Sequence, residues 1–442
     1  MLSRPVCLHH ALRVCRPLLT VGLVLCAPAA ACGSGPNGPP PAGPAATRSV
    51  NPAPPAAGPQ AAALADHVRV AAARGVAYLR RTQAADGTWT PGPGPAVTGL
   101  VLAALLDDPA VARDDEIVTD ALRAVLVRVQ ADGSIRDGDG GILANYNTAI
   151  CVSALSRLPR NAEAAAAVAG GVAFLRSTQW QPGMTLPDGT TLTAAHPFAG
   201  GAGYGRHGRP DMSNTQFFVQ ALHDAGVTAD DEAVQAAVTF LSRCQATAGN
   251  AYFPPGTLAD DGGFIYATSI NAEHPDIPVS YANPAAVEAA RAGRPVSGLR
   301  GYGSVTYAGF KSFVYAELAG DDPRVVAALR WIGANYTLKQ NPGMPADLAD
   351  HGLYYYYLTH ARALAAWGRS ELPLDNGKHV AWADALVHEL LGRQRPDGSW
   401  INDADRWMED DPALVTAYAL HALRAAGPHL SEAQPPAGGV AQ

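Results

Sequence analysis

The chain has 442 residues and a net charge of −7; 48% of its residues are hydrophobic and 16% are charged. A chain this apolar can bury a large core, which excludes a disordered or highly solvated protein. Because no run of Lys or Arg follows the N-terminal region, the sequence also argues against a nucleic-acid surface.

The first residues, 1–31, are typical of an export signal. Arg4, Arg13 and Arg16 form a positively charged start, and the apolar run at 18–26 is too short to span a bilayer. We therefore expect this segment to direct export and to be removed from the mature chain.

Two kinds of processing fit the small residues that end this signal. Ala29 and Ala31 form an A-x-A site for ordinary signal peptidase, whereas AAAC is a lipobox with Cys32 as the lipidated residue. Residues 32–64 are rich in Gly, Pro and Ala and are expected to form an extended tether. Since a surface lipoprotein needs such a tether, we favour a lipid anchor at the extracytoplasmic face of a bacterial membrane over a periplasmic or secreted form.

Internal repeats organise the rest of the chain. A seven-residue pattern occurs twice, as QAADGTW at 83–89 and as QRPDGSW at 394–400. An apolar run with helical spacing precedes each Gln, a second apolar run follows a loop, and weaker copies bring the number of units to six. The first runs end near Gln83, Gln130, Gln179, Gln245, Tyr336 and Gln394, and the second runs cover 97–106, 147–155, 214–222, 305–318, 353–367 and 415–423.

Six helical hairpins can stack as an open solenoid or close into a ring. The second runs are apolar nearly all round, as helices buried on both sides are, and the polar caps that an open array needs are not seen. Little of the chain alternates with period two, which argues against a β fold. We predict an all-α (α/α)6 toroid over residues 65–427, with the second runs as the inner barrel, and a disordered tail at 428–442.

The seven-residue pattern is expected to join these units rather than to catalyse a reaction. Asp-Gly makes a turn, the Trp covers a neighbouring helix end, and the Gln hydrogen-bonds the end of its own helix. Five of the six second runs begin at or near a Thr, and we expect Thr or Asn there to cap the helix.

QAADGTW and QRPDGSW resemble the QW repeats of squalene–hopene and related triterpene cyclases. With its six hairpins, the chain resembles the wider prenyltransferase/squalene-oxidase repeat superfamily, whose members fold as (α/α)6 toroids. The stretches at 301–318, 351–368 and 405–423 also resemble exported bacterial members of unknown function. The resemblance spans about residues 66–427. It implies an isoprenoid or other apolar small molecule in the central cavity and, if the chain is active, a cyclase or mutase reaction of the isomerase or lyase type.

The acid motif of the cyclases is degenerate in this chain. In squalene–hopene cyclases, a D-x-D-D-T-A stretch at the start of an inner helix carries the Asp that protonates an alkene. The best match, DMSNT at 211–215, keeps Asp211 and Thr215 but has Ser213 and Asn214 in place of the central acids. The standard acid is therefore expected to be absent. The remaining candidates for a catalytic acid are Asp211, Asp410 and Asp411.

Metal and cofactor sites are not expected. The zinc-binding D-x-C element of the protein prenyltransferases has no counterpart, because Ala149 and Ser242 stand two residues before Cys151 and Cys244. In an oxidising compartment these two cysteines can form a disulfide. Each lies in an apolar helical run, however, where a free thiol packs as a small core residue, and we favour that interpretation.

Two long loops, at 181–210 and 246–304, are expected to lie on the rim where the inner helices begin. The positive ends of the helix dipoles at this rim favour an anionic group. Asp211, Ser213 and Asn214 can alternatively cap their helix, and we favour that role. Of the four tyrosines at 354–357, no more than two can face the cavity. The candidate cavity or rim residues are Tyr204, Ser213, Asn214, Thr215, Tyr302, Tyr307, His351, Tyr354 and Tyr355.

Three functions fit the sequence. The first is a terpene-cyclase-like protein that acts on or binds an isoprenoid in the central cavity with a replacement acid. The second is a non-catalytic exported scaffold that binds a glycan, a lipid or a protein through its rim. The third is a glycan-processing enzyme, since other (α/α)6 toroids do that work with paired carboxylates. The expected partners are an apolar small molecule and, through the lipid anchor, the membrane, with no nucleic acid.

Overall fold

The computed structural model describes residues 59–431, except 139–142, 187–188, 206–207, 272–273 and 275. The predicted export signal, the lipidation site Cys32 and most of the tether lie outside the described residues, as does the chain from residue 432 onward. None of the described helices combines the length and the apolar composition that crossing a membrane requires.

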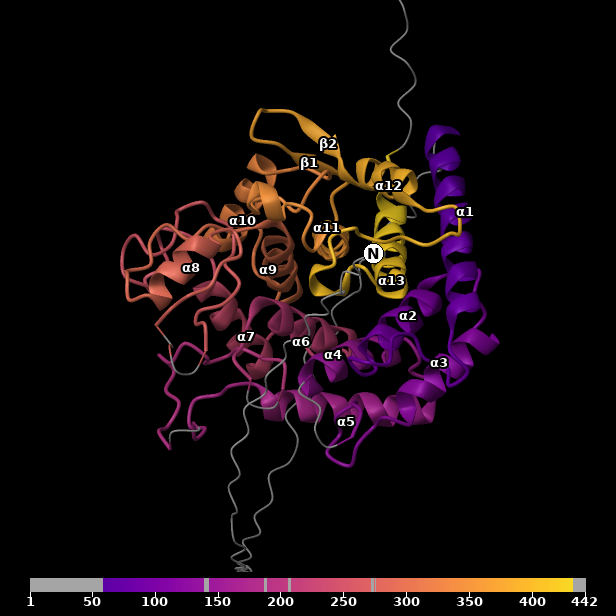
Figure 1. Cartoon of the computed structure of the whole chain (residues 1–442), viewed down its shortest axis with the longest axis horizontal. Coiled ribbons are helices and arrows are strands. Elements are labelled where there is room, and N and C mark those ends of the chain that lie inside the picture. The colour runs from indigo at the N-terminus through magenta and orange to yellow at the C-terminus, as the bar shows by residue number, and fades with distance from the viewer. Residues whose placement is uncertain are drawn as a thin grey trace, which may run out of the picture. The chain divides into compact units, whose positions relative to one another are not determined.

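Within the described residues, six helices form an inner ring. They are α2 (Ala96–Asp107), α4 (Ala144–Leu155), α6 (Met212–Asp224), α9 (Gly303–Tyr315), α11 (Leu353–Trp367) and α13 (Pro412–Ala426). Each packs against the next, and α13 packs against α2, which closes the ring (Figure 1). These helices are buried on nearly every side; in α2, all residues from Ala96 to Leu105 are buried.

Six further helices of the described chain form an outer layer around this ring. They are α1 (Pro59–Thr82), α3 (Glu116–Leu126), α5 (Ala162–Thr178), α7 (Glu232–Arg243), α10 (Pro323–Ala334) and α12 (Trp382–Arg393). Their apolar residues lie on one face, as the helical spacing of buried Ile117, Ala121 and Val125 in α3 illustrates. The outer helices pack on the inner ones, α12 for example on both α11 and α13. The prediction of an all-α (α/α)6 toroid is confirmed.

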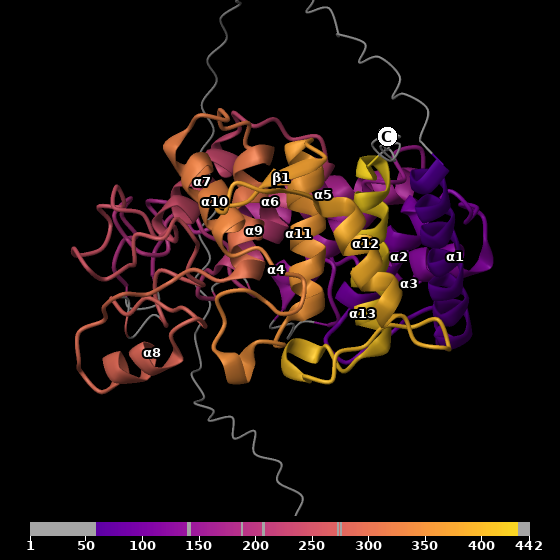
Figure 2. The same ribbon diagram turned by 90° about the horizontal axis from the view of Figure 1, so that it is seen from above.

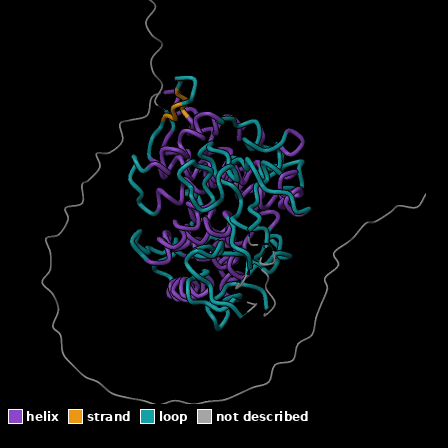
Figure 3. The backbone as a smooth tube through the Cα atoms, turned by 90° about the vertical axis from the view of Figure 1, so that its left-hand side faces the viewer, coloured by secondary structure: helices purple, strands orange, loops and turns teal. Residues whose placement is uncertain are grey.

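Smaller elements extend from the ring. Helix α8 (Pro284–Arg291) lies within the second long loop, at the side of the ring (Figure 2). An antiparallel hairpin of β1 (Glu371–Pro373) and β2 (His379–Ala381) lies at the edge of the described chain (Figure 3). The 3₁₀ turns are η1 (Ala346–Leu348), η2 (Arg406–Met408) and η3 (Gly427–His429).

The glutamines of the two full seven-residue patterns connect neighbouring outer helices. The Gln83 side-chain amide donates to the carbonyl of Ile117 in α3 at 3.1 Å, as well as to its own turn. The Gln394 amide likewise donates to the carbonyl of Ala71 in α1 at 2.8 Å, so it links the last unit to the first. We expected each Gln to bond the end of its own helix. It reaches further because the turn directs the amide toward the next unit.

The tryptophans of these patterns bond to their own helices, and Trp400 also covers the neighbouring α1, where a Cβ on Gly75 would come within 3.0 Å of its ring. Trp89 Nε1 donates to the carbonyl of Leu79 in α1 at 3.0 Å, and Trp400 Nε1 donates to that of Leu390 in α12 at 2.8 Å. The expected cover of a neighbouring helix is therefore seen at Trp400, and because the Asp-Gly turn reverses the chain, each Trp also reaches back to the helix that precedes it.

The recurring threonines do not cap the inner helices. Thr98 lies inside the first turn of α2, and its hydroxyl accepts from the backbone N–H of Trp89 at 3.1 Å. Thr416 in α13 accepts in the same way from Trp400 at 3.1 Å. The equivalent hydroxyls in the other units are those of Thr148, Thr215 and Thr306. The capping prediction was wrong because these hydroxyls face the preceding loop and fix it to the helix.

The folded unit is slightly longer than predicted at both ends. Helix α1 begins at Pro59 and includes buried Leu64, since Pro suits a first helical position and the Ala-rich run after it favours helix. At the other end, the Ser431 backbone N–H donates to the Asp384 carboxylate at 2.9 Å, which fixes the chain beyond residue 427. Cys151 and Cys244 are both buried free thiols, not a disulfide.

Candidate functional site

A small cavity, which we call the tyrosine chamber, lies at the end of the barrel where the inner helices begin. Its volume is about 80 Å³. Inner helices contribute side chains from their first two turns, the two long loops contribute three tyrosines, and the loop before α13 contributes a Trp and a Glu. The lining residues are Tyr146, Tyr204, Ser213, Tyr266, Tyr302, Ser304, Val305, Tyr355, Trp407, Glu409 and Tyr418.

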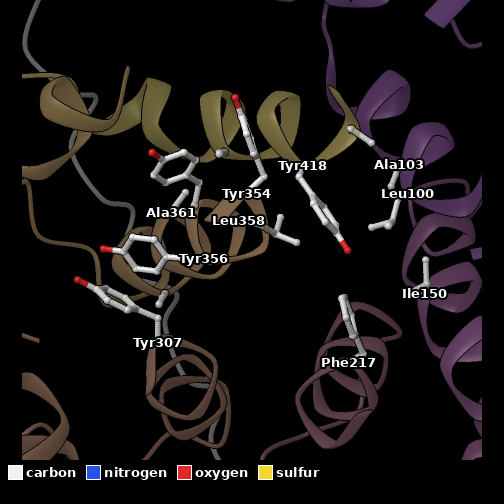
Figure 4. Packing of buried hydrophobic residues seen from close by; sticks show 14 of the residues in the cluster. Leu100, Ala103, Ile150, Phe217, Tyr307, Tyr354, Tyr356, Leu358, Ala361 and Tyr418 are labelled. Atoms are coloured by element: carbon white, nitrogen blue, oxygen red, sulfur yellow. The ribbon is translucent and has the colours of Figure 1, made fainter. Parts of the chain in front are cut away.

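Aromatic rings pack on one another around the chamber. The ring centroids of Tyr355 and Tyr418 lie 6.1 Å apart, and those of Tyr146 and Tyr204 lie 5.7 Å apart. Phe217 connects the two pairs, at 6.2 Å from Tyr355 and 5.2 Å from Tyr146. Tyr418 and Phe217 both point into the space that the inner helices enclose (Figure 4). Most of the chamber wall is therefore aromatic.

The hydroxyl groups of these side chains converge on the chamber. Tyr204 Oη lies 3.3 Å from Tyr266 Oη, and Tyr355 Oη lies 3.0 Å from Ser213 Oγ. Burial raises the pKa of the Tyr355 and Tyr418 hydroxyls above their ordinary value, so both stay protonated at neutral pH. A ligand in the chamber would meet aromatic faces and hydroxyl groups together.

Glu409 is the acidic residue among the described residues that line the chamber. Its carboxylate accepts from the backbone N–H groups of Tyr355 at 2.7 Å and Tyr354 at 3.2 Å, and from the Asn402 amide at 2.7 Å. It thereby caps α11, whose own N-cap residue, Gly352, makes no side-chain bond. Burial outweighs these bonds and raises the pKa of Glu409 to about 7. An acid with this pKa can give and take a proton near neutral pH.

The three acids predicted from the sequence do not line the chamber. Asp211 is fully buried and caps α6, accepting from the Asn214 backbone N–H at 2.9 Å and from its side-chain amide at 3.0 Å. Burial raises the pKa of Asp211, and the charge of Arg209, 3.9 Å away, opposes this. Asp411 caps α13 and Asp410 is exposed. Asp211 therefore has the capping role weighed above, whereas the capping role of Asp411 was not predicted.

The other predicted residues divide into two groups. Tyr204, Ser213, Tyr302 and Tyr355 line the chamber. Asn214 instead supports Asp211, and the Thr215 hydroxyl accepts from the backbone N–H of Ala202 at 3.1 Å, which fixes the first long loop.

Three predicted residues lie away from the chamber. Tyr307 packs in the toroid wall, with its ring centroid 4.9 Å from that of His360. Its hydroxyl points away from the barrel interior (Figure 4). Tyr354 packs against Tyr357, with ring centroids 5.4 Å apart. His351 lies near the mouth, 6.2 Å from the Trp407 ring, without lining the cavity. Of the four consecutive tyrosines, Tyr355 faces the chamber.

Several lining residues were missed at the sequence level. Nothing in the sequence singles out Tyr146 or Tyr418, because polar residues such as Asn147, Thr148 and Thr416 stand near them. Glu409 lies directly before Asp410 and Asp411, and nothing in the sequence separates it from them. The difference is its burial and its bond to Asn402.

Trp407 is held at the mouth of the chamber in a strained backbone. Trp407 and Met408 have φ values of 59° and 65°, which cost of order 1 kcal/mol or more each for residues other than glycine. The Trp407 ring packs on Tyr281 at 5.3 Å and over Gly352, where a Cβ would come within 2.9 Å of it. The residue nevertheless remains 37% exposed. The surroundings thus hold a partly exposed indole beside the chamber, with the Arg406 guanidinium over its ring, 5.4 Å from the centroid.

A second hollow, an open groove of about 950 Å³, lies between the two long loops. Tyr252, Phe253 and Pro254 are among its lining residues, and the acid in its lining, Asp276, is exposed. Across the described chain, no three His, Cys, Asp or Glu side chains lie where they could hold a metal ion together.

Comparison with known proteins identifies the architecture. No protein-family model and no curated protein matches the chain. A family 76 glycoside hydrolase from a bovine Bacteroides thetaiotaomicron strain matches in structure over 80% of this chain and 77% of its own, with 10% identity and a TM-score of 0.50. This chain shares the (α/α)6 toroid fold of such enzymes.

Two other solved structures have lower TM-scores. The type II terpene cyclase MstE from Scytonema matches over 83% of this chain and 100% of its own, with 14% identity and a TM-score of 0.47. A protein from Actinoplanes matches over 81% of this chain and 99% of its own, with 18% identity and a TM-score of 0.46. Identities this low concern the fold alone, and function has to be argued from the site.

Proposed function

We propose that this protein binds a hydroxylated ligand, such as the terminal sugar unit of a glycan, in the tyrosine chamber. The observation that carries the proposal is the lining itself, in which aromatic faces, protonated hydroxyls and one buried acid, Glu409, surround one small cavity. A sugar ring offers C–H faces that pack on aromatic rings. Its hydroxyl groups both donate and accept hydrogen bonds, as the tyrosine and serine hydroxyls of the chamber do.

An isoprenoid, the ligand that the family resemblance implies, fits this lining less well. The chamber of about 80 Å³ is far below the ~300 Å³ at which pockets begin to enclose drug-sized ligands. A hydrocarbon chain would also make no hydrogen bonds to the hydroxyls of the lining, whereas a sugar can. Ser213 and Asn214, finally, stand where the cyclases carry their acids. The chamber is suited to the polar end of a ligand.

Trp407 extends this site to the surface. Its ring lines the chamber, and part of the residue remains exposed at the mouth. A rigidly held, partly exposed indole with the Arg406 guanidinium over its ring provides a contact surface for the next unit of a chain whose end occupies the chamber. A glycan longer than one sugar should therefore bind more tightly than a single sugar.

Export through the signal and anchoring at Cys32, which we also propose, agree with this ligand class. An anchored protein at the extracytoplasmic face is in contact with surface glycans, whereas isoprenoid substrates are made in the cytoplasm and would have to be delivered.

Glu409 favours a second candidate function, proton transfer to or from the bound ligand. Its pKa of about 7 suits a general acid or base at neutral pH. The paired carboxylates of ordinary glycosidases are missing from the described lining, because Asp211 is buried behind it. A Glu409→Gln variant distinguishes the two functions: pure binding survives the change, whereas turnover of a bound ligand is lost.

A glycan array probed with the purified full chain tests the proposal, with squalene-loaded vesicles as the apolar alternative. We expect glycan binding that Trp407→Ala weakens at least tenfold. Tyr252→Phe, a change in the open groove outside the chamber, is the matched control and should leave binding unchanged. Binding of squalene with no glycan captured, or equal effects of the two variants, would contradict the proposal.

A further inference from the structure

Lys311 is a buried cation-forming side chain that the proposed function does not use. It lies on α9 and is only 1% exposed. Its Nζ lies 2.6 Å from Gln216 Oε1 and 2.8 Å from Gln220 Oε1, both on α6. The charged and neutral forms of an amine both carry at least two N–H groups, so either form satisfies both glutamine oxygens.

The orientation of Gln220 is also fixed from its other end. Its amide nitrogen donates to Asp224 Oδ1 at 2.8 Å. Although burial works in the opposite direction, a hydrogen bond from His223 and the charge of Arg157 hold the pKa of Asp224 at about 2. An ionised carboxylate only accepts hydrogen bonds, so Gln220 must turn its nitrogen to Asp224 and its oxygen to Lys311.

The orientation of Gln216 follows from Lys311. Because the oxygen of Gln216 accepts from Lys311, its nitrogen faces Tyr355 and donates to the hydroxyl at 3.1 Å. A phenol has one proton, and the proton of Tyr355 is therefore free to point elsewhere. Its other neighbour is Ser213 Oγ at 3.0 Å, in the chamber lining.

We infer that Lys311 is a positioning residue. By fixing the orientation of Gln216, it makes the hydroxyls of Tyr355 and Ser213 a hydrogen-bond relay that ends in an O–H donor directed into the chamber. The relay selects a ligand that places an acceptor oxygen at this point, whether an ether, carbonyl or hydroxyl oxygen, and disfavours an ammonium or amide N–H group. The inference deepens the proposed function and rests on it for the ligand, but the proton positions themselves require no ligand.

Neutron diffraction from deuterium-exchanged crystals of the full chain observes the relay directly. In the wild type, we expect the Gln216 amide deuteriums to face Tyr355 and the Tyr355 deuterium to lie on the side of Ser213 or the chamber. The Gln216→Glu variant keeps the bond from Lys311 but turns an acceptor toward Tyr355, so the Tyr355 deuterium should swing toward the new carboxylate. In Lys311→Met, the Gln216 amide should occupy both orientations.

A wild-type Tyr355 deuterium that points at Gln216 overturns the inference. So does a Gln216→Glu variant in which this deuterium stays on the Ser213 side, and this variant decides the question if Lys311→Met fails to fold. A residue that merely fills space would move none of these protons. If the deuteriums lie as inferred while no glycan binds, the relay stands and the proposed ligand fails.

Discussion

Burial and hydrogen bonding oppose each other at Glu409. The Asn402 amide and the backbone N–H groups at the start of α11 favour the carboxylate, yet removal from water dominates and raises the pKa from 4.5 to about 7. The folded state therefore holds a proton that the unfolded chain releases between these values. The chamber gains an acid that titrates near neutral pH, and the protein loses stability when that acid ionises.

This sign gives a prediction for the pH dependence of stability. Protonated Glu409 contributes up to about 3 kcal/mol to the free energy of unfolding. This contribution is fully present below pH 4.5 and is lost as the pH rises through 7. Buried His360 and His421, whose pKa values burial lowers, change stability in the opposite direction over this range. Between pH 5 and pH 8, the unfolding free energy of the wild type, measured in urea, should therefore fall relative to that of Glu409→Gln. Exposed Asp410→Asn is the control and should keep the wild-type slope. Equal slopes in the wild type and Glu409→Gln would contradict the assignment.

Gly352 allows a second prediction at the residue scale. Gly352 and Gly368 both have φ in the left-handed region, at 67° and 77°, but only at Gly352 would a Cβ meet the Trp407 ring. Gly368→Ala should therefore cost about 1 kcal/mol in unfolding free energy for its backbone alone. Gly352→Ala should cost at least 1 kcal/mol more, measured by urea unfolding, and should weaken glycan binding by displacing Trp407. Equal costs would show that Trp407 is not held in place by this contact.

Residue-level features were predictable where a side chain itself carries the signal. The replacement of the cyclase acids by Ser213 and Asn214 is visible in the sequence, and so is the rim position of Tyr204 and Tyr302. The choice of Tyr355 over Tyr354 depends on the rotation of α11, which the neighbouring helices set. Sequence periodicity in a helix buried on all sides does not reveal that rotation.

At the scale of elements, the joints between outer helices explain why the seven-residue pattern recurs. Its Gln side chains end on backbone carbonyls of the next outer helix, as Gln394 does on Ala71. The repeat units themselves were predictable, because apolar runs and Asp-Gly turns are side-chain patterns. The partner of each Gln was not, since a backbone carbonyl has no signature in the sequence.

Removing one joint should loosen the ring at that point. Gln394→Ala deletes the amide that bonds the carbonyls of Ala71 and Gly398, although the Ala71 carbonyl keeps its bond within α1, so we expect a loss of about 1–2 kcal/mol in unfolding free energy. Gln235→Ala removes an exposed Gln with a single bond, to Ala229, and should cost well under 1 kcal/mol. Chemical unfolding of both variants measures the difference. Equal losses of unfolding free energy in the two variants would show that the bond from Gln394 to the next unit does not stabilise the ring.

At the scale of the whole molecule, contact between α13 and α2 turns a series of hairpins into a closed ring. The sequence predicted this closure because its second runs lack a polar face, and such helices are stable only when covered on both sides. A closed ring has no end from which to fray, unlike an open repeat array.

Closure predicts cooperative unfolding. Far-UV circular dichroism and tryptophan fluorescence should report one coincident transition in urea. A chain lacking residues 382–431, and with them α12 and α13, should lose this transition, because α2 and α11 would expose their buried sides. Stepwise unfolding of the full chain, or an unchanged midpoint in the shortened one, would favour an open array.

The most direct test of the chamber as a binding site is the effect of a single hydroxyl on affinity. Isothermal titration calorimetry with the best-bound array glycan should compare the wild type with Tyr418→Phe, which keeps the ring and removes the hydroxyl that points into the barrel. We predict affinity about tenfold weaker, because a ligand oxygen or hydroxyl is left unpaired. Unchanged glycan affinity, together with tighter uptake of squalene by the variant, would contradict the account.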